Sequence, residues 1–262
     1  MNKQIAIIGG GNLGQAIASG LISENFKASN LTITRHKTDL LSAFKAQGVH
    51  ITSNNIDAIK ASQIIIIAVK PYKIEAVLKE VSPHISNEHL VISVVSDYTI
   101  DSINTILQTS PVVFRAMPNT ASSVNESMTC IASLNAKEED TKTVTSIFNA
   151  LGETIRIEEQ LMDAATVLGA CGIAYVLRFI RGMIQGGIEI GFDAKTATLI
   201  ATQTVKGASE LLLQKGNHPE AEIDKVTTPK GCTIAGLNEM EHQGFSSALI
   251  KGIKTSYNNI SD

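Results

Sequence analysis

The stretch that decides the fold is Ile5-Ala-Ile-Ile-Gly-Gly-Gly-Asn-Leu-Gly14. An apolar run typical of a short strand is followed by a glycine-rich turn, and Leu13, Ile17 and Leu21 then recur at helical spacing. The glycines fit the pattern G-x-G-x-x-G between a strand and a helix, which is the context in which this motif binds a dinucleotide. We therefore predict a nucleotide-binding strand, turn and helix at the start of the chain.

The residues of this turn have separate predicted roles. Gly9 permits the tight turn, Gly11 lets the backbone approach a pyrophosphate, and Gly14 allows the helix to pack closely. Asn12 and Leu13 complete the predicted cofactor-binding turn, where the first N–H groups of the helix donate to phosphate. A glycine-rich turn without a ligand is the alternative interpretation.

Apolar runs through the first half of the chain indicate alternating strands and helices. Continuous apolar strands are typical of a sheet that is buried on both faces. Further strands are predicted at residues 31–34, 64–69, 90–95, 112–116, 128–132 and 154–157. With helices between most of them, this pattern predicts an α/β fold with a doubly wound parallel sheet.

The strand patterns stop after about Glu158. Long helices are predicted at residues 160–190, 194–214, 232–242 and 245–258, rich in Ala, Gly, Leu and Ile and poor in charge. Helices this apolar need a partner on more than one side, so we expect them to form the core of a dimer. The predicted domains are therefore residues 1–158, which bind the nucleotide, and the all-helical residues 159–262.

Composition favours a small-molecule partner in the cytoplasm. The chain has 22 basic and 25 acidic residues, a net charge of −3 and no Trp, which argues against a nucleic-acid surface. The six scattered histidines argue against a metal site, and the three cysteines form no C-x-x-C pair. A strand that begins by Gln4 leaves no room for a signal peptide. The apolar stretch at residues 167–180 is short and is accompanied by Arg178 and Arg181, so we expect no membrane span.

The end of the second strand predicts which dinucleotide is bound. An NAD enzyme usually has Asp or Glu at this point for the ribose 2′-hydroxyl, whereas a 2′-phosphate requires cationic donors. This chain has Thr34-Arg-His-Lys37 at this point, and the next carboxylate after the strand is Asp39. Arg35 and Lys37 therefore favour NADPH, with NADH as a weaker cofactor, and a solvated basic cluster is the alternative interpretation.

Three other segments carry candidate site residues. Ala68-Val-Lys-Pro71 and Arg115-Ala-Met-Pro-Asn119 each end a predicted strand at the edge where such folds bind ligands. Thr227-Thr-Pro-Lys-Gly-Cys-Thr233 breaks the helical pattern near the end of the chain. Free N–H groups at the start of a helix, together with short hydroxyls, can hold a carboxylate without an arginine.

These motifs together resemble the pyrroline-5-carboxylate reductases over nearly the full length of the chain. The resemblance rests on G-x-G-N-L-G at residues 9–14, A-V-K-P at 68–71, R-A-M-P-N at 115–119 and above all the segment 224–245. That segment contains D-K-V-T-T-P-K-G-C-T-I-A-G-L followed by E-H-Q-G-F and is much more specific than the glycines.

The resemblance implies a fold, an activity and an assembly. We expect a Rossmann domain at residues 1–158 that binds NADP and a helical domain at 159–262 that dimerises and binds substrate, with dimers often joined into rings. The implied reaction is the NADPH-dependent reduction of 1-pyrroline-5-carboxylate, a cyclic imino acid, to L-proline in the last step of proline biosynthesis.

The resemblance also assigns site residues. The loop from Thr228 to Thr233, with Gly231 and Cys232, would wrap the substrate carboxylate, and the hydroxyl of Thr233 would face the ring nitrogen as the catalytic group. Glu159 would lie beside the substrate. Asn55 would contact the cofactor near the adenosine ribose. Val69 and Lys70 would contact it nearer the nicotinamide.

Several residues depart from the family pattern. Lys230 stands where the family usually has glycine, Asp97 stands in a usual Ala-Gly pair, and Ile173 replaces a usual proline. A related reductase for another cyclic imine or carbonyl acid therefore stays open, as does an NADP-binding regulator without turnover. The sequence also leaves open the proton donor, the number of dimers and the strictness of the NADPH preference.

Overall fold

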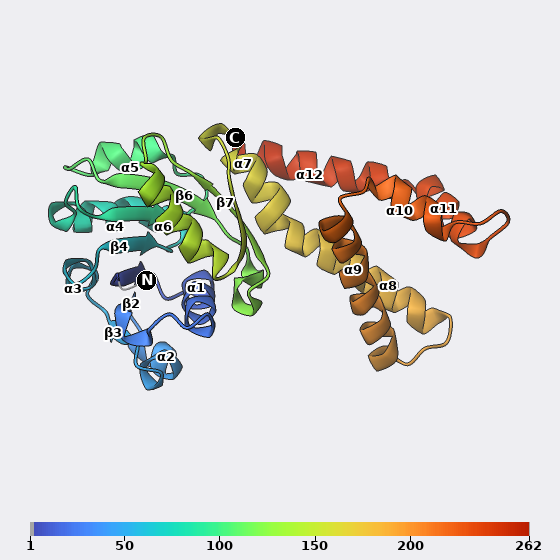
Figure 1. Cartoon of the computed structure of the whole chain (residues 1–262), viewed down its shortest axis with the longest axis horizontal. Coiled ribbons are helices and arrows are strands. Elements are labelled where there is room, and N and C mark those ends of the chain that lie inside the picture. Colours follow the sequence, from blue (N-terminus) through green and yellow to red (C-terminus); the bar gives the residue numbers. More distant parts are fainter. Residues whose placement is uncertain (1–2, 262) are drawn as a thin grey trace. The chain divides into compact units, whose positions relative to one another are not determined.

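One eight-stranded sheet organises the first part of the chain in the computed structural model, which describes residues 3–261 (Figure 1). The strand order is β3-β2-β1-β4-β5-β6-β7-β8. Strands β1 to β6 are all parallel, and the order reverses between β1 and β4, which confirms the predicted doubly wound sheet. The strands are β1 (Ile5–Ile8), β2 (Leu31–Thr34), β3 (His50–Thr52), β4 (Ile64–Ile67), β5 (Leu90–Ser93), β6 (Val112–Met117), β7 (Ser127–Ala132) and β8 (Gly152–Arg156).

Contrary to the prediction, the sheet is not parallel throughout, because one of its last strands reverses direction. Strand β7 runs antiparallel to β6, with Met117 opposite Cys130, whereas β8 is parallel to β7. The link from Met117 to Ser127 holds a single 3-10 turn, Thr120–Val124, and ends through Asn125 at φ 59°. A parallel neighbour would need a crossover of about a dozen residues or more, so a link this short reverses the chain.

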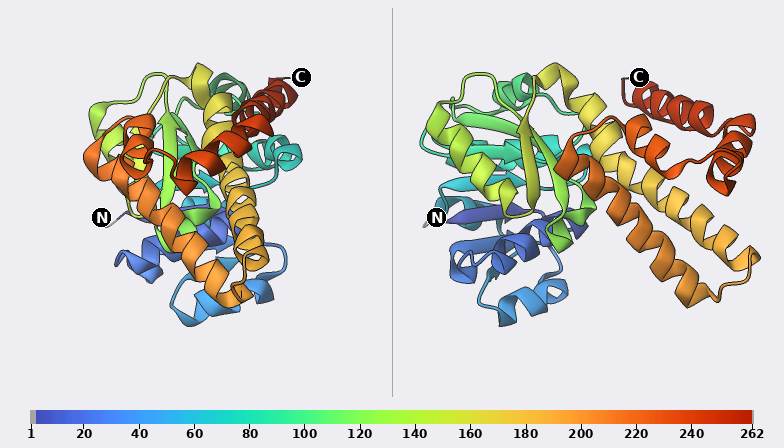
Figure 2. Two further views of the ribbon diagram at one scale, coloured as in Figure 1. Left: turned by 90° about the vertical axis from the view of Figure 1, so that its right-hand side faces the viewer. Right: turned by 45° about the vertical axis from the view of Figure 1, so that its right-hand side comes forward.

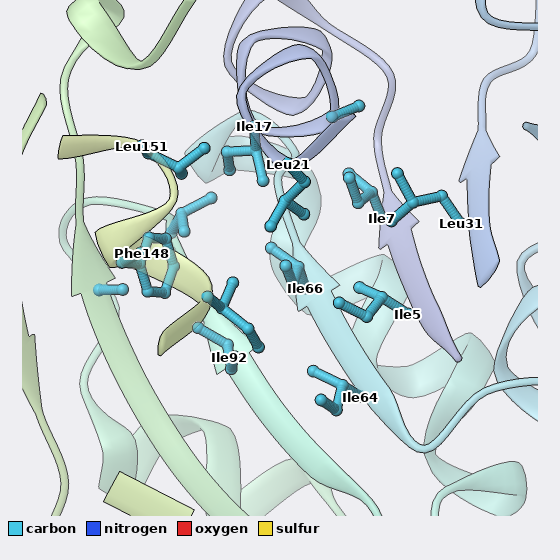
Figure 3. Packing of buried hydrophobic residues seen from close by; sticks show 14 of the residues in the cluster. Ile5, Ile7, Ile17, Leu21, Leu31, Ile64, Ile66, Ile92, Phe148 and Leu151 are labelled. Atoms are coloured by element: carbon cyan, nitrogen blue, oxygen red, sulfur yellow. The ribbon is translucent and has the colours of Figure 1, made fainter. Parts of the chain in front are cut away.

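Helices cover both faces of the sheet. Those of this part of the chain are α1 (Asn12–Ser23), α2 (Ser42–Ala46), α3 (Asn55–Lys60), α4 (Ile74–Val81), α5 (Ile100–Ile106) and α6 (Glu138–Asn149). Apolar residues of α1 and α6 pack on one face, and those of α3, α4 and α5 pack on the other. Figure 3 shows the first of these clusters, in which Ile17, Leu21 and Phe148 lie over Ile66 and Ile92.

Strand β4 shows why the central strands are apolar without interruption. Ile64 and Ile66 contribute to the cluster beneath α1 and α6, whereas Ile65 and Ile67 contribute to the cluster beneath α3, α4 and α5. All these side chains are 0% exposed, since a helix layer covers each face. Strand β3 was not predicted, because its three residues, His50, Ile51 and Thr52, are only partly buried or exposed and form no apolar run.

The chain divides into two compact units, one up to Cys171 and one at Gly172–Asn259. The predicted domain boundary at residues 158 and 159 stays a prediction. The later helices are α7 (Met162–Ala165), a π-helical turn at Thr166–Cys171, α8 (Gly172–Glu189), α9 (Ala194–Lys215), α10 (Pro219–Val226), α11 (Cys232–His242) and α12 (Phe245–Ser261). Helix α10 was not predicted, because it is short and polar.

Helices α8 and α9 run side by side in the second unit (Figure 2). The chain turns between them through Gly191 at φ 117°, and the carboxylate of Asp193 caps α9 by accepting from the N–H groups of Lys195 and Thr196. A Cβ on Gly187 would lie 3.2 Å from the Cβ of Ala197, so small residues allow this close packing.

Apolar side chains of the second unit remain exposed in the single chain. A groove of about 760 Å³ lies between α8 and the helices α11 and α12, with Val176, Phe179, Met183, Phe245 and Leu249 among its lining residues. Of the helices in the described part of the chain, the run Glu159–Glu189 is long and apolar enough to cross a membrane, with a mean hydropathy of 1.6. A helix that another chain covers has the same length and composition.

We predict that charge introduced into this groove weakens self-association. Val176→Lys places an ammonium on a side chain that is 48% exposed in the single chain, and burying that charge against a second copy would be costly. Light scattering across a concentration series should show a mass that falls toward 27.9 kDa on dilution. Leu134→Lys, at a site 50% exposed in the first unit, is the control and should keep the wild-type mass.

Candidate active site

The glycine turn after β1 has the geometry that the motif requires. Gly9 adopts φ 109°, and a Cβ there would lie 2.5 Å from the carbonyl oxygen of Ala68. A Cβ on Gly14 would lie 2.2 Å from the carbonyl oxygen of Gly9. At Gly11 no atom lies within 4 Å of the corresponding position, so the backbone there is open to a ligand.

The N-terminus of α1 is free to bind an anion. Gly11 is its N-cap residue, and no side chain caps the helix. The first turn contains no acidic residue, so neither a carboxylate nor a capping oxygen competes for its N–H groups. These residues fit a dinucleotide pyrophosphate, which the N–H groups of Gly11, Asn12 and Leu13 would hold.

Arg35 is tied to the glycine turn by its side chain. Its Nη1 donates to the carbonyl oxygen of Gly10 at 2.6 Å, and Gln15 Nε2 donates to the same oxygen at 3.0 Å. The hydroxyl of Thr34 accepts from the N–H of Gly9 at 3.2 Å. Arg35 is half-buried and Lys37 is exposed, so the end of β2 presents two cations beside the turn.

The other predicted cofactor residues follow β3 and β4 at the same edge. Val69 is half-buried and Lys70 is exposed, directly after β4. Asn55 begins α3, and its Nδ2 donates to the carboxylate of Glu80 at 3.2 Å. Because β1 to β4 are parallel, their carboxyl ends bring these residues and the glycine turn to one edge of the sheet.

Two departures from the family pattern preserve a glycine-like backbone. Asp97 follows β5 at φ 60°, and Lys230 also adopts φ 60°. This left-handed region is strained for residues that carry a Cβ. The two loops therefore keep the local backbone that glycine allows and differ from the pattern in side chain and in stored strain.

Glu159 lies in a cluster of charges that the sequence did not predict. Its Oε1 accepts from the N–H of Ile100 at 2.7 Å and pairs with Arg115 Nη1 at 3.3 Å. Arg115 is 4% exposed, and its Nη2 lies 3.7 Å from Asp163 Oδ1. The sequence did contain a signal for this cluster, because Arg115 is the single cation within the otherwise apolar strand β6.

The π-helical turn at Thr166–Cys171 was also not predicted. Its six residues interrupt the helix expected at 160–190, and Asn119 Nδ2 donates to the carbonyl oxygen of Gly169 at 3.3 Å. Asn119 is buried and also holds the N–H of Ala121 through its Oδ1. The R-A-M-P-N segment therefore connects the sheet to this turn through polar contacts.

The loop at Thr228–Thr233 leads into α11 as the broken helical pattern predicted. The N–H of Gly231 donates to the carbonyl oxygen of Thr228 at 2.9 Å, and a Cβ on Gly231 would lie 2.6 Å from Thr228 Oγ1. Gly231 is the N-cap residue and Cys232 the first residue of α11, and no side chain caps the helix. The hydroxyl of Thr233 is exposed, and it has no hydrogen-bond partner within residues 3–261.

This geometry leaves the start of α11 available to an anion. Thr233 is the second residue of α11 and therefore lies in its first turn, whereas Gly231 is the N-cap residue. The described residues contain no cluster of three or more His, Cys, Asp or Glu side chains suited to a metal ion. Short hydroxyls, N–H groups, the Cys232 thiol and the Lys230 ammonium are the functional groups that this loop offers.

The fold and the glycine turn define a dinucleotide-binding protein of the Rossmann type. Residues 4–97 match the family described as NADP oxidoreductase, coenzyme F420-dependent. Residues 159–262 match the family described as pyrroline-5-carboxylate reductase dimerisation.

Similar proteins identify the family more narrowly. Pyrroline-5-carboxylate reductase 1 of Dictyostelium discoideum is 46% identical over 96% of this chain, which spans 48% of that relative. Pyrroline-5-carboxylate reductase 2 of the same organism is 44% identical over 97% of this chain and 91% of the relative. The crystal structure of Plasmodium falciparum pyrroline carboxylate reductase with NADP bound matches with a TM-score of 0.90 and 27% identity, covering 99% and 97% of the two chains. The chain belongs to the pyrroline-5-carboxylate reductase family.

We predict that Arg35 discriminates between the two nicotinamide cofactors. Arg35→Ala should weaken the binding of NADPH by about 1.5–3 kcal/mol, because a charge-assisted contact with the 2′-phosphate is lost. The binding of NADH, which lacks this phosphate, should be weakened less. Fluorescence titration with both cofactors measures the difference. Gln15→Ala is the matched control, because it removes the other donor to the Gly10 oxygen and should affect both cofactors equally. Equal losses in Arg35→Ala would show that the arginine only supports the turn.

We also predict that Lys230→Gly stabilises the protein. Glycine removes a left-handed penalty of roughly 1–2 kcal/mol but loses more chain entropy on folding, which leaves a net gain of about 0.5–1 kcal/mol. Urea unfolding of the assembled protein measures this gain. Lys230→Ala keeps a Cβ at φ 60° and should show no such gain. Equal stability of the glycine and alanine variants would contradict a strained loop.

Proposed function

We propose that the protein reduces 1-pyrroline-5-carboxylate to L-proline with NADPH, the last step of proline biosynthesis. The observation that carries the proposal is the pair of uncapped helix N-termini, one after the glycine turn and one after the Thr228–Thr233 loop. The first suits a dinucleotide pyrophosphate and the second suits a small carboxylate. Membership of the reductase family supports the same assignment.

In this proposal the first unit binds the cofactor through the ends of its strands. Gly9, Gly11 and Gly14 shape the turn, and Asn12 and Leu13 present N–H groups to the pyrophosphate. Arg35 and Lys37 attract the 2′-phosphate, which is why NADPH is favoured over NADH. Asn55, Val69 and Lys70 complete the predicted contacts.

The helical unit would supply the contacts with the substrate carboxylate. The N–H groups of Cys232 and Thr233 at the start of α11 carry a partial positive charge that stabilises a carboxylate, and Gly231, whose N–H donates to Thr228, shapes the loop around it. The hydroxyl of Thr228 lies in the same loop. Glu159 is a further predicted substrate contact. The structure gives its carboxylate two partners within the first unit, Ile100 and Arg115.

The chemistry divides between the cofactor and the protein. Bound NADPH supplies the hydride. The contribution of the chain is to orient the imine and to polarise it, for which Thr233 can donate a hydrogen bond to the ring nitrogen. A threonine hydroxyl is a poor acid, so the proton comes from a protonated substrate imine or from water relayed at Thr233.

The proposal extends to partners and location. The dimerisation-family match and the exposed apolar groove support self-association through the C-terminal helices. A second copy would also cover the apolar residues of the Glu159–Glu189 run, so we propose a protein of the cytoplasm with neither a membrane nor a nucleic acid as its partner.

The test is an assay of NADPH oxidation with 1-pyrroline-5-carboxylate, with identification of L-proline as the product. A panel of larger and smaller cyclic imino acids and open-chain oxo acids, run in parallel, tests the related-reductase alternative. Faster turnover of another member of the panel would reassign the substrate. Tight NADPH binding without turnover of any member would favour a non-catalytic regulator.

We predict that Thr233→Ala lowers kcat/KM for the imine by about 1–3 kcal/mol of transition-state stabilisation, with unchanged affinity for NADPH. Thr233→Ser should recover most of this loss because the hydroxyl remains. Thr227→Ala is the matched control, because the Thr227 hydroxyl donates to the carbonyl oxygen of Asp224 within the same part of the chain. A fully active Thr233→Ala variant would remove this hydroxyl from the chemistry.

A further inference from the structure

A buried arginine lies at the ligand-binding edge of the sheet. Arg115 is 4% exposed, and its Nε and Nη2 have no hydrogen-bond partner among the described residues. Its Nη1 pairs with Glu159 Oε1 at 3.3 Å, and Nη2 lies 3.7 Å from Asp163 Oδ1. A cation removed from water depends strongly on its counter-charge, so this environment holds the carboxylate of Glu159 in place.

Glu159 also accepts a hydrogen bond from the residue at the end of a loop. The same Oε1 accepts from the N–H of Ile100 at 2.7 Å, and Ile100 is the first residue of α5. The preceding residues 94–99 form the turn between β5 and α5 and include Asp97 at φ 60°. Arg115 therefore acts through one carboxylate oxygen on the point where this strained turn enters its helix.

The turn belongs to the half of the edge expected to face the nicotinamide. Strands β5 and β6 are parallel neighbours with Ser93 opposite Arg115, so both end at the carboxyl edge. In doubly wound sheets a dinucleotide lies across the switch point, and its adenosine ribose lies at the end of β2. The end of β5, on the other side of the switch point between β1 and β4, is therefore nearer the nicotinamide.

We propose that Arg115, through Glu159, is a positioning residue that fixes the turn between β5 and α5 against the nicotinamide half of the cofactor. The inference rests on the proposed use of NADPH. It assigns Arg115 and Glu159 a function in holding the cofactor ring for hydride transfer, distinct from a contribution to stability alone and from a direct contact between Glu159 and the substrate.

The test removes both charges together. Deleting one partner would leave the other buried and unpaired, whereas replacing a buried pair by apolar residues of similar volume is often neutral for stability. In the variant Arg115→Met/Glu159→Met we expect near-native thermal stability and an NADPH dissociation constant raised about tenfold, because the nicotinamide half is less well held. Binding of 2′-phospho-ADP-ribose, which lacks the nicotinamide, should stay within about twofold of wild type.

Kinetics provide a second readout. With 1-pyrroline-5-carboxylate we expect kcat to fall and the primary isotope effect with 4-deuterated NADPH to rise toward its intrinsic value, because the hydride step becomes slower. Asp163→Asn is the matched control, since it alters the longer contact with the same guanidinium without touching Ile100, and it should keep wild-type binding and kinetics.

Three outcomes would overturn the proposal. A folded double variant with native NADPH affinity and isotope effect would assign the pair to stability alone. Equal losses for NADPH and 2′-phospho-ADP-ribose would remove the link to the nicotinamide. A raised KM for the imine with unchanged NADPH binding would instead mean that Glu159 contacts the substrate directly.

A second variant covers the case in which the double variant does not fold. Glu159→Gln keeps an acceptor for Ile100 and loses the charge, and it should show the same selective loss of NADPH affinity at a smaller magnitude. Native NADPH affinity in this variant would also overturn the proposal. The two binding measurements need no turnover, so a protein inactive with every imine would contradict the proposed function and leave this test intact.

Discussion

The close approach of α1 to the end of β1 is the constraint on which the nucleotide site depends. Any Cβ at Gly14 would overlap the carbonyl oxygen of Gly9, at 2.2 Å, and one at Gly9 would overlap that of Ala68, at 2.5 Å. The turn can therefore be this tight only with glycine at both positions. Its tightness points the uncapped N-terminus of α1 toward the sheet edge where the other strand ends converge.

The sequence predicted the buried strands and the glycine turn, because each depends on residues that are close together in the chain. Buried strands such as β1 and β4 are apolar throughout because both faces are covered, and the glycine turn follows from sterics. Strand β7 was predicted but not its antiparallel direction, because direction depends on the length of the preceding link. Strand β3 was missed because it is only partly buried. The pairing of Arg115 with Glu159 joins residues 44 positions apart, and no sequence period encodes such a contact.

The backbone of the loops that contain Lys230 and Asp97 could not be predicted from the sequence. Lys230 and Asp97 depart from the family pattern, in which glycine is usual, and this departure suggested that the two loops had changed their conformation. Both residues instead accept the left-handed backbone, so the change lies in strain and charge. Strain of this kind persists where the surrounding structure determines the backbone, and it clusters at functional sites. The motif predicted where these loops lie, whereas the backbone conformation of a residue with a Cβ at such a position is set by the surrounding structure.

The two units differ in how they bury apolar surface, and this difference bears on function. In the first unit, helices on both faces of the sheet cover nearly every apolar side chain of the central strands. In the second unit, Val176, Leu177 and Leu249 remain 48%, 59% and 44% exposed in the single chain. Apolar side chains exposed to this extent along helices gain most of their stabilisation when another surface covers them. The Thr228–Thr233 loop belongs to that second unit, whose apolar helix faces remain exposed in the single chain, whereas the nucleotide turn has a complete core beneath it.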